Sequence, residues 1–347
     1  MPVASSAMAF GPPVVALVGA TASGKSAVAR DVATPVAGSD RPGAPSLLPV
    51  ELVSVDSMAV YRGMDIGTAK PTPEEQVAYS YHLIDLVDAS EEFTVLQFQT
   101  AGRAALSGIA GRNHGALLVG GTGLYLRSLV DRLTFPGRYP EIACALEQEL
   151  DTAGPEGSAG QDRALRALHD RLLRLDPIAA GRIAPSNRRR LVRALEVTVG
   201  AERPFSTFGP GLERYPPTSV SLVGIRRHPA ELDRRIAERF DRLMELGFLE
   251  EVRSLVARPG GLSRTARQAL GYRELLTHIE GGVPVVEAVD QAVRRTRAFA
   301  RRQMAWFRRD PRIVWLEQDT DPVAAIAALF REIPRDGAGM GDCPTAP

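Results

Sequence analysis

The chain contains a complete phosphate-binding loop near its N-terminus. Gly19 to Ser26 read Gly-Ala-Thr-Ala-Ser-Gly-Lys-Ser and directly follow the apolar run Val14–Val18. In this pattern backbone N–H groups turn toward phosphate oxygens, while the lysine adds a positive charge and the serine hydroxyl suits a Mg2+ ion. We predict a phosphorylated ligand here, with Ser26 as the metal ligand and Mg2+ as the cofactor. The phosphate-binding residues are predicted to be Gly19, Thr21, Ala22, Ser23, Gly24, Lys25 and Ser26.

Lysine usage supports a role for the loop lysine. Of the 42 basic residues only Lys25 and Lys70 are lysines. A compact ammonium fits between phosphate oxygens differently from a planar guanidinium. A chance lysine in an arginine-rich chain is the alternative for Lys25. Lys70 becomes a second residue of interest.

Composition bounds the class of protein. The chain has 347 residues, 44% hydrophobic and 24% charged, which fits one large or two modest globular domains. Two cysteines, Cys144 and Cys343, are too few for a disulfide framework or a four-ligand zinc site. No stretch approaches the roughly 18 apolar residues of a membrane helix. We expect a cytoplasmic protein without membrane contact, with disordered ends at 1–10 and 333–347.

The positive charge is concentrated in one part of the chain. Residues 182–312 hold 26 arginines and 15 acidic residues, a net charge of +11, whereas the whole chain carries +1. Such a block indicates a polyanionic partner such as nucleic acid. A solvated, arginine-rich helical surface remains the alternative.

The order of predicted elements defines the fold class. The apolar runs 14–18, 51–55 and 116–119 predict buried parallel strands, each followed by a motif at its C-terminal end. Helical spacing covers 141–150, 162–173 and 188–199, and a returning strand follows at 220–225. Long helices over 229–257 and 285–309 and a last strand at 313–316 complete the chain. We predict a P-loop NTPase-like parallel α/β core at 11–136 and 205–332, with an inserted all-helical domain at 137–204.

The segment after the second strand has the composition of a binding site. Residues 53–71 are too apolar and irregular for an ordinary loop, and Asp56 stands at the strand's end. Asp56 is a candidate base or a Mg2+ ligand through water, and spacing alone does not separate these roles. A helix-capping Asp is the structural alternative.

Several longer strings lie in one order along the chain. They are Asp-Ser-Met-Ala-Val-Tyr-Arg-Gly-Met-Asp-Ile-Gly-Thr-Ala-Lys-Pro at 56–71, His-Leu-Ile-Asp at 82–85, Gly-Gly-Thr-Gly-Leu-Tyr-Leu at 120–126, Asn-Arg-Arg-Arg-Leu-Val-Arg-Ala-Leu-Glu-Val at 187–197, Arg-Pro-Phe-Ser at 203–206 and Ala-Leu-Gly-Tyr-Arg-Glu at 269–274. Together, from about residue 14 to 316, they closely resemble bacterial tRNA dimethylallyltransferases. Ordered strings of this length are more specific than a glycine loop alone.

The resemblance implies a reaction. Family members move a dimethylallyl group from dimethylallyl diphosphate to N6 of the adenosine 3′-adjacent to the anticodon of tRNA. It implies that Asp56 receives the N6 proton, that Thr122 hydrogen-bonds near the transferred group, and that Arg235, with Arg239, binds the diphosphate. A turn-forming Thr122 and surface ion pairs of both arginines are the alternatives.

The resemblance also implies contacts to the anticodon stem-loop, whose target base must leave its stack. The implied base-reading residues are Asp56, Ser57, Met58, Ala59, Arg189, Arg190, Arg193, Arg267, Gln268, Gly271 and Tyr272. Phosphate contacts are expected from Arg294, Arg295, Arg301, Arg302, Arg308 and Arg309. The aromatic residues Phe299, Trp306 and Phe307 are more typical of core packing than of a stacking platform.

The chain departs from the family pattern in places. It has Ala20, Ala59 and Tyr81 where the family often has proline, glutamine and histidine. The start of the insert, Tyr139 to Ala143, lacks the family's arginine, which puts one tRNA contact in doubt, and the 34–49 loop is long.

A P-loop small-molecule kinase, an adenylate prenyltransferase and a non-catalytic RNA-binding module are the rival functions. We expect a monomer.

Overall fold

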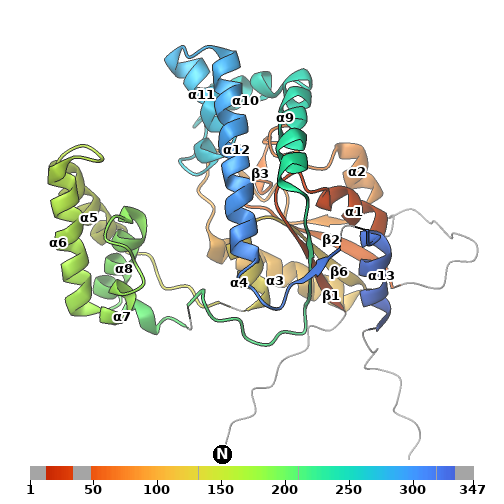
Figure 1. Cartoon of the computed structure of the whole chain (residues 1–347), viewed down its shortest axis with the longest axis horizontal. Coiled ribbons are helices and arrows are strands. Elements are labelled where there is room, and N and C mark those ends of the chain that lie inside the picture. The colour runs from red at the N-terminus through yellow and green to blue at the C-terminus, as the bar shows by residue number, and fades with distance from the viewer. Residues whose placement is uncertain (1–12, 34–47, 132, 210, 318, 333–347) are drawn as a thin grey trace, which may run out of the picture. The chain divides into compact units, whose positions relative to one another are not determined.

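The chain forms two compact units. A computed structural model describes residues 13–33, 48–131, 133–209, 211–317 and 319–332, so the predicted disordered ends and most of the 34–49 loop lie outside the described residues. Unit 1 consists of Met1–Asp131 and Pro217–Pro347, and unit 2 is Arg132–Pro216. Figure 1 follows the chain from one unit into the other and back.

Unit 1 is organised around a parallel sheet. Its strands are β1 (Val14–Val18), β2 (Val50–Val55), β4 (Tyr81–His82), β6 (Gly115–Gly120), β7 (Ser221–Ile225) and β8 (Val314–Leu316). They lie in the order β4-β2-β6-β1-β7-β8, and each neighbouring pair is parallel. The loops that follow β1, β2 and β6 therefore emerge at the same edge of the sheet. The predicted parallel α/β core is confirmed.

Helices cover this sheet and extend beyond its C-terminal edge. In unit 1 they are α1 (Lys25–Val32), α2 (Pro73–Ala78), α3 (Val95–Gly111), α4 (Gly123–Val130), α9 (Pro229–Glu245), α10 (Phe248–Ala257), α11 (Tyr272–Gly281), α12 (Val285–Phe307) and α13 (Pro322–Glu332). A short pair of strands, β3 (Tyr61–Arg62) with β5 (Val87–Asp88), and the 3-10 turn η2 (Ala266–Gln268) complete unit 1. Figure 1 shows α12 running lengthwise beside α9 and α11.

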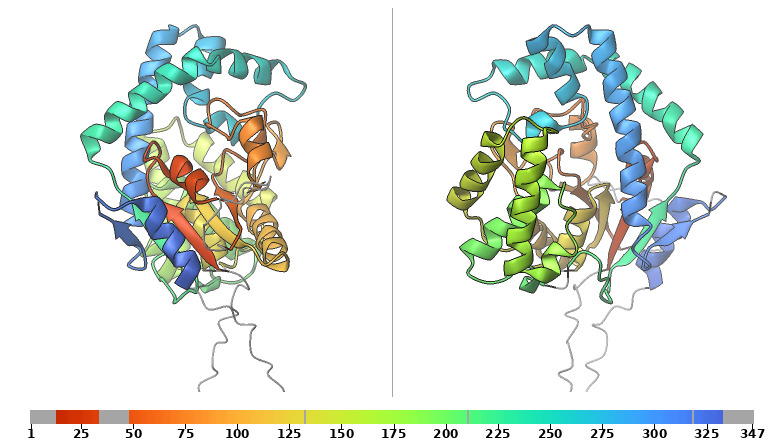
Figure 2. Two further views of the ribbon diagram at one scale, coloured as in Figure 1. Left: turned by 90° about the vertical axis from the view of Figure 1, so that its right-hand side faces the viewer. Right: turned by 60° about the vertical axis from the view of Figure 1, so that its left-hand side comes forward.

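Both faces of the sheet are buried, which explains why its strands are apolar throughout. Val15 and Leu17 of β1 belong to a cluster with α1 and α13. Val14 and Ala16, which alternate with them, belong to the larger cluster that includes α3 and α4. Side chains of a strand point to opposite faces in turn, so one short run supplies both clusters. Figure 2 shows α1 and α13 together on one face of the sheet, the face to which Val15 and Leu17 belong.

Two helix predictions need correction. Pro229–Ala257 is not one helix, because Gly247 adopts φ 94° in the left-handed region and separates α9 from α10. Glycine takes this conformation without the steric cost of a Cβ. Residues 258–284, predicted to be only a connection, contain α11, whose Glu274 side chain accepts from the Gly271 backbone N–H at 2.9 Å.

The regular elements among the described residues of unit 2 are all helical. They are α5 (Pro140–Thr152), α6 (Ala159–Leu175), α7 (Pro177–Ala180), α8 (Arg188–Gly200) and the 3-10 turn η1 (Phe205–Thr207). Leu150, Leu172 and Leu195 are completely buried in its core. The unit extends past the predicted insert 137–204 at both ends. At the C-terminal end Phe205 packs against the core, and the Ser206 N–H donates to Asp176 Oδ2 at 2.7 Å.

Among the described residues, no helix combines the length and apolar character that a membrane span requires.

Candidate active site

The phosphate loop takes the expected position between β1 and α1. Gly24 has φ 97° and directly precedes α1, and Ala22 also has a positive φ of 61°. A Cβ on Gly19 would lie 2.7 Å from the Ile225 carbonyl oxygen of the neighbouring strand β7, so glycine is needed there. The loop therefore has the tight backbone that directs N–H groups inward.

Lys25 is folded back onto this loop. Its ammonium donates to the Ala20 carbonyl at 2.6 Å and to Ser23 Oγ at 3.5 Å, and the residue is 9% exposed. Burial lowers the pKa of Lys25 to about 8, with Asp56 opposing and Arg239 adding to the shift. Among the residues that the structure describes, no carboxylate pairs with this buried ammonium, an arrangement that favours the arrival of an anion.

Arginines of α9 and of the segment before it lie against the loop. Arg239 donates to Thr21 Oγ1 at 3.2 Å and to the Gly67 carbonyl at 3.4 Å, and burial lowers its pKa. Arg235 pairs with Glu231 at 3.4 Å, the surface pairing considered as its alternative role. Its guanidinium still lies beside Gly24, as does that of Arg227, which donates to the Ser23 carbonyl at 3.3 Å. The cation cluster thus includes one arginine, Arg227, that sequence reasoning missed.

Asp56 and Thr122 come together at the ends of β2 and β6. Asp56 Oδ1 accepts from the Met58 N–H at 2.8 Å, and no hydrogen bond to its Oδ2 occurs among the described residues. Thr122 Oγ1 accepts from the Ser57 N–H at 3.2 Å. Thr122 precedes α4 without capping it by its side chain, so its hydroxyl is directed across to Ser57. One carboxylate oxygen of Asp56 thus orders the turn while the other is available to a ligand.

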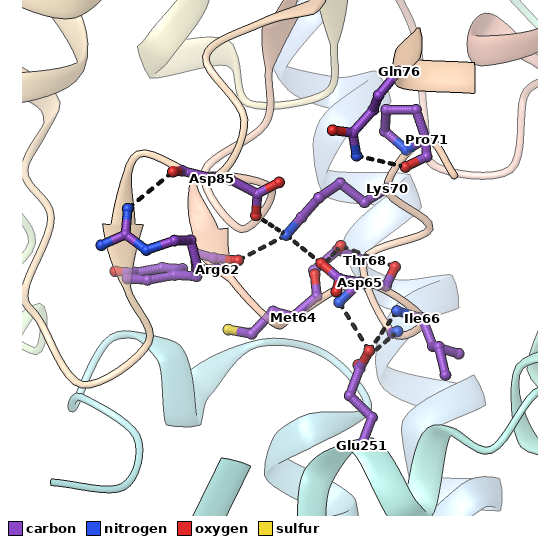
Figure 3. Close-up of polar contacts among 12 residues, drawn as sticks. Arg62, Met64, Asp65, Ile66, Thr68, Lys70, Pro71, Gln76, Asp85 and Glu251 are labelled. Atoms are coloured by element: carbon purple, nitrogen blue, oxygen red, sulfur yellow. Dashed lines mark hydrogen bonds and ion pairs between the residues drawn. The ribbon is translucent and has the colours of Figure 1, made fainter. Parts of the chain in front are cut away.

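A buried lysine holds the segment after Asp56 in place. The Lys70 ammonium, whose side chain is 1% exposed, contacts Asp65 and Asp85 carboxylates at 2.6 Å each and donates to the Tyr61 carbonyl at 2.8 Å (Figure 3). These contacts satisfy all three donors of an ammonium. Lys70, which lysine usage singled out, therefore has a structural role, since it holds Asp65, Asp85 and the Tyr61 carbonyl together.

A carboxylate of α10 anchors the same segment. Glu251 accepts from the backbone N–H groups of Asp65, Ile66 and Gly67 at 2.9, 2.6 and 3.1 Å (Figure 3). It also accepts from the Tyr272 hydroxyl at 2.6 Å. Gly67 is packed so closely that a Cβ would lie 2.2 Å from the Phe248 ring. Glu251 thereby fixes the carbonyl that Arg239 contacts.

A cavity of about 510 Å³ in unit 1 collects many of the predicted residues. Thr21 and Arg239 line it on the phosphate side, and Asp56 and Thr122 line it at the neighbouring strand ends. Of the predicted tRNA-binding residues, those that line it are Asp56, Ser57, Met58, Gln268 and Tyr272. Of the predicted phosphate contacts, Arg295 and Arg302 line it, with Phe299 between them. The arrangement brings an anion site and a carboxylate into one cavity.

Several predicted tRNA contacts are buried or paired, and Tyr272 in the cavity wall is one of them. Ala59 is 6% exposed and Tyr272 is 0% exposed, with the Tyr272 ring packed against Phe248. A Cβ on Gly271 would lie 2.6 Å from the Phe248 ring. These residues therefore form part of the core and present no open surface for base stacking. Arg267 pairs with Glu280.

The arginines predicted on α8 belong to unit 2. Arg189 and Arg190 are exposed near the start of this helix, as a nucleic-acid contact requires. Arg193 instead pairs with Glu196 at 2.7 Å and donates to the carbonyls of Pro136 and Gly137. Its guanidinium is occupied in holding the beginning of the unit.

The aromatic residues of α12 divide between core and cavity. Phe307 is 2% exposed and lies in the core, as predicted. Trp306 packs against the glycine loop after β6, where a Cβ on Gly123 would lie 2.0 Å from its indole nitrogen. Phe299 lines the cavity with Arg302, whose guanidinium lies 5.8 Å from the ring centre.

Sequence reasoning missed polar residues of the site, among them Arg227, Glu251 and Gln303. Gln303 joins the Thr21 N–H, at 2.8 Å, to the Gly121 carbonyl, at 2.9 Å. Its only sequence signal is an uncharged polar residue within an arginine-rich helical stretch. Glu251 has no distinguishing signal, because acidic residues are common on exposed helices.

Comparison with known proteins agrees with this geometry. Residues 59–310 match the IPP transferase family. The chain belongs to this family. Its relatives include the tRNA dimethylallyltransferase of a Nocardioides species, 42% identical over 89% of this chain and 92% of the relative. That of Streptomyces avermitilis is 43% identical over 93% and 94%. The resemblance found in the sequence is confirmed.

Solved structures of the IPP transferase family have the same fold. A tRNA isopentenylpyrophosphate transferase from Bacillus halodurans matches with TM-score 0.61 and 33% identity, over 92% of this chain and 97% of that one. A eukaryotic dimethylallyltransferase acting on tRNA matches with TM-score 0.63 over 92% and 78%, and at 21% identity it supports the fold alone. The P-loop NTPase-like fold thus extends across the family.

Proposed function

We propose that this protein transfers a dimethylallyl group from dimethylallyl diphosphate to N6 of the adenosine 3′-adjacent to the anticodon of tRNA. One observation carries the proposal: Thr21 and Arg239 of the anion site line the same cavity as Asp56 and Thr122. An anionic leaving group and a carboxylate that can accept a proton are the two groups that this alkylation requires.

The diphosphate is proposed to bind at the phosphate loop. The loop N–H groups, Lys25 and Arg239 surround it, and Arg235 and Arg227 reach it from beside Gly24. These donors stabilise the negative charge that grows on the leaving oxygen. Because Lys25 now lies against its own loop, we propose that its ammonium exchanges the Ala20 carbonyl for a phosphate oxygen.

The adenosine is proposed to enter the cavity turned out of its stack, with N6 toward Asp56. The N6 lone pair forms the new bond to C1 of the dimethylallyl group as the C1–O bond breaks and its electrons leave with diphosphate. Asp56 accepts the N6 proton, which keeps the charges balanced. Thr122, held by Ser57, hydrogen-bonds beside the transferred group.

Mg2+ is the proposed cofactor. Ser26 is exposed in the first turn of α1, and its hydroxyl is the proposed protein ligand of the ion. Among the described residues no cluster of three His, Cys, Asp or Glu side chains is placed to hold a metal. Mg2+ commonly keeps waters and substrate phosphates as its other ligands, and when bound it offsets diphosphate charge.

The tRNA is proposed to contact both units. In unit 1 the exposed arginines Arg294, Arg301, Arg308 and Arg309 of α12 and its C-terminal end offer charge to the phosphate backbone. In unit 2, Arg189 and Arg190 offer the same. Gln268, exposed at the cavity, is placed to hydrogen-bond a base edge.

The function is tested by following the label from dimethylallyl diphosphate. Purified protein is incubated with labelled donor, Mg2+ and unmodified tRNA, ATP or AMP in separate reactions. Label should appear on tRNA alone, at the adenosine next to the anticodon, and should disappear with EDTA. Label on AMP or ATP only would identify an adenylate prenyltransferase. Phosphate transfer from ATP would identify a kinase, and tRNA binding without transfer an RNA-binding module.

A further inference from the structure

A single glutamine joins the two loops that meet at the cavity. Gln303 of α12 is 8% exposed, within a stretch whose neighbours Arg301 and Arg302 are exposed. Its Oε1 accepts from the Thr21 N–H at 2.8 Å, and its Nε2 donates to the Gly121 carbonyl at 2.9 Å. An uncharged amide is suited to this place because it accepts and donates at once.

The loop after β6 is shaped to receive this side chain. A Cβ on Gly121 would lie 2.2 Å from Gln303 Nε2, and a Cβ on Gly123 would lie 2.0 Å from the Trp306 indole nitrogen. The glycines on either side of Thr122 therefore let α12 lie directly on the loop. The close approach leaves no room for a side chain between α12 and the loop that carries Thr122.

The two bonded loops carry opposite parts of the site. Thr21 contacts Arg239 in the anion site, and Thr122, one residue after Gly121, contacts Ser57 next to Asp56. The strands before these loops, β1 and β6, are paired up to Val18 and Gly120. Beyond that point Gln303 hydrogen-bonds to both loops. Gln303 thus connects the phosphate loop directly to the loop that carries Thr122.

We propose that Gln303 is a positioning residue that fixes the spacing of the phosphate loop and the Thr122 loop, and so the distance between C1 of the donor and N6 of the acceptor. The inference rests on the proposed function. Gln303 acts through the two loops and takes no part in proton transfer. Because small misplacements of reacting atoms slow a displacement reaction strongly, its effect belongs on the chemical step.

The first test replaces the amide while keeping its length. Gln303→Met removes both hydrogen bonds, and Gln303→Glu keeps the acceptor for Thr21 but sets a carboxylate against the Gly121 carbonyl. We expect kcat to fall about 10- to 100-fold in both, with KM for tRNA within about threefold of wild type. Gln291→Met is the matched control and should keep full activity, because Gln291 lies on the same helix and its side chain hydrogen-bonds to Glu287, away from the two loops.

The Gln303→Met result separates positioning from simple packing. A packing role predicts that Met, of similar volume, retains kcat, or that any loss follows the fraction of folded protein measured by thermal unfolding. A kcat within about threefold of wild type in Gln303→Met would overturn the proposal. A loss seen only in KM would overturn it as well.

A second route disturbs the bridge from the loop side. Gly121→Ala pushes against Gln303 Nε2 and should lower kcat in the same way. In a Gln303→Ala background this clash is relieved, so the two substitutions together should cost less than the product of their separate effects. Independent, multiplicative effects would contradict a direct contact between the two positions.

Hydrogen exchange separates this inference from the proposed function. The peptide containing Thr21 should exchange its amide protons faster in Gln303→Met than in wild type or Gln291→Met. This readout needs no substrate, so it stands even if wild type transfers no label to tRNA, a result that would refute only the function. Unchanged exchange at Thr21 would overturn the bridging role.

Discussion

The phosphate loop and the segment 56–71 line the same cavity but are held in different ways. The phosphate loop is ordered partly by contacts within itself, such as Lys25 to the Ala20 carbonyl and the Ser23 N–H to the same carbonyl at 3.3 Å, and Gln303 adds the contact to the Thr21 N–H. Segment 56–71 depends on Glu251, which is 184 to 186 residues away in the chain. The phosphate loop is recognisable as a sequence motif, and so is segment 56–71, but the residue that holds segment 56–71 is identified only in the fold.

The comparison is tested most strongly at Asp56, where we expect Asn to slow chemistry without weakening binding. Asn keeps the oxygen that accepts from Met58 but loses the basic carboxylate. Single-turnover transfer should fall about 10²-fold or more, while tRNA affinity changes by less than about threefold. Filter binding and rapid quench measure the two. Collapse of tRNA binding with an unchanged transfer rate would make Asp56 a recognition residue.

Removal of Lys70 should show how far segment 56–71 depends on its anchor. Lys70→Met leaves the Asp65 and Asp85 carboxylates without their buried cation, although the Asp65 side chain is 58% exposed and can be hydrated. We expect a loss of about 2 kcal/mol in the free energy of unfolding, measured in urea. Arg234→Met, which breaks only an exposed pair with Glu238, is the control and should cost below about 0.5 kcal/mol. Equal losses would show that burial of Lys70 contributes nothing.

For the phosphate loop we expect a pH effect on donor binding. The pKa of Lys25 is about 8 in the free protein, below the ordinary 10.5, and a bound diphosphate must raise it. Below pH 8 the ammonium is already charged. Above pH 8 a proton must be taken up on binding, so affinity for dimethylallyl diphosphate should fall about tenfold per pH unit.

Calorimetry in two buffers of different ionisation enthalpy would measure this proton uptake. Lys25→Met should bind more weakly at pH 7 and lose the pH dependence between 8 and 10. A wild-type affinity that stays level over this range would contradict a depressed Lys25 pKa.

The smallest effect concerns the opposite end of β2, far from either loop. Glu51 accepts from Arg112 at 2.9 and 2.8 Å and contacts His82 and His114. Although burial opposes the shift, these partners lower its pKa to about 2 from 4.5. Above pH 4.5 the carboxylate is charged in both folded and unfolded chains and stabilises the fold fully. As pH falls from 4.5 through 2 this contribution is lost.

We expect Glu51 to account for about 1 kcal/mol of the acid loss in unfolding free energy, since Arg112 is 46% exposed and water screens the pair. Urea titrations at pH 6 and pH 3 measure it. Glu51→Gln should be less stable than wild type at pH 6 and lose less stability on acidification. The same pH slope in both proteins would exclude Glu51 as the source.

Sequence predicted those parts of the molecule whose cause is local. The apolar run Val14–Val18 became β1 with the same bounds, because an apolar run before a glycine loop has few alternatives. Asp56 was predicted from its place at a strand end and Thr122 from the family resemblance, and the sheet pairs the two strands that precede them. Glu251, Gln303 and Arg227 were not found, since their partners are backbone groups of distant loops. The prediction of one helix over Pro229–Ala257 was wrong for a related reason. The periodic pattern of apolar residues does not reveal a single glycine in the left-handed region.

Gly247 has a consequence for the site that concerns helix phase. It separates α9, which carries Arg239, from α10, which carries Glu251. Arg239 contacts the Gly67 carbonyl, and Glu251 accepts from the Gly67 N–H. Each residue turns an α-helix by about 100°. One residue inserted or deleted at this bend would rotate Glu251 away from the peptide while leaving every chemical group of the site in the chain. Chain length at Gly247 is therefore as much a part of the site as the identity of Arg239.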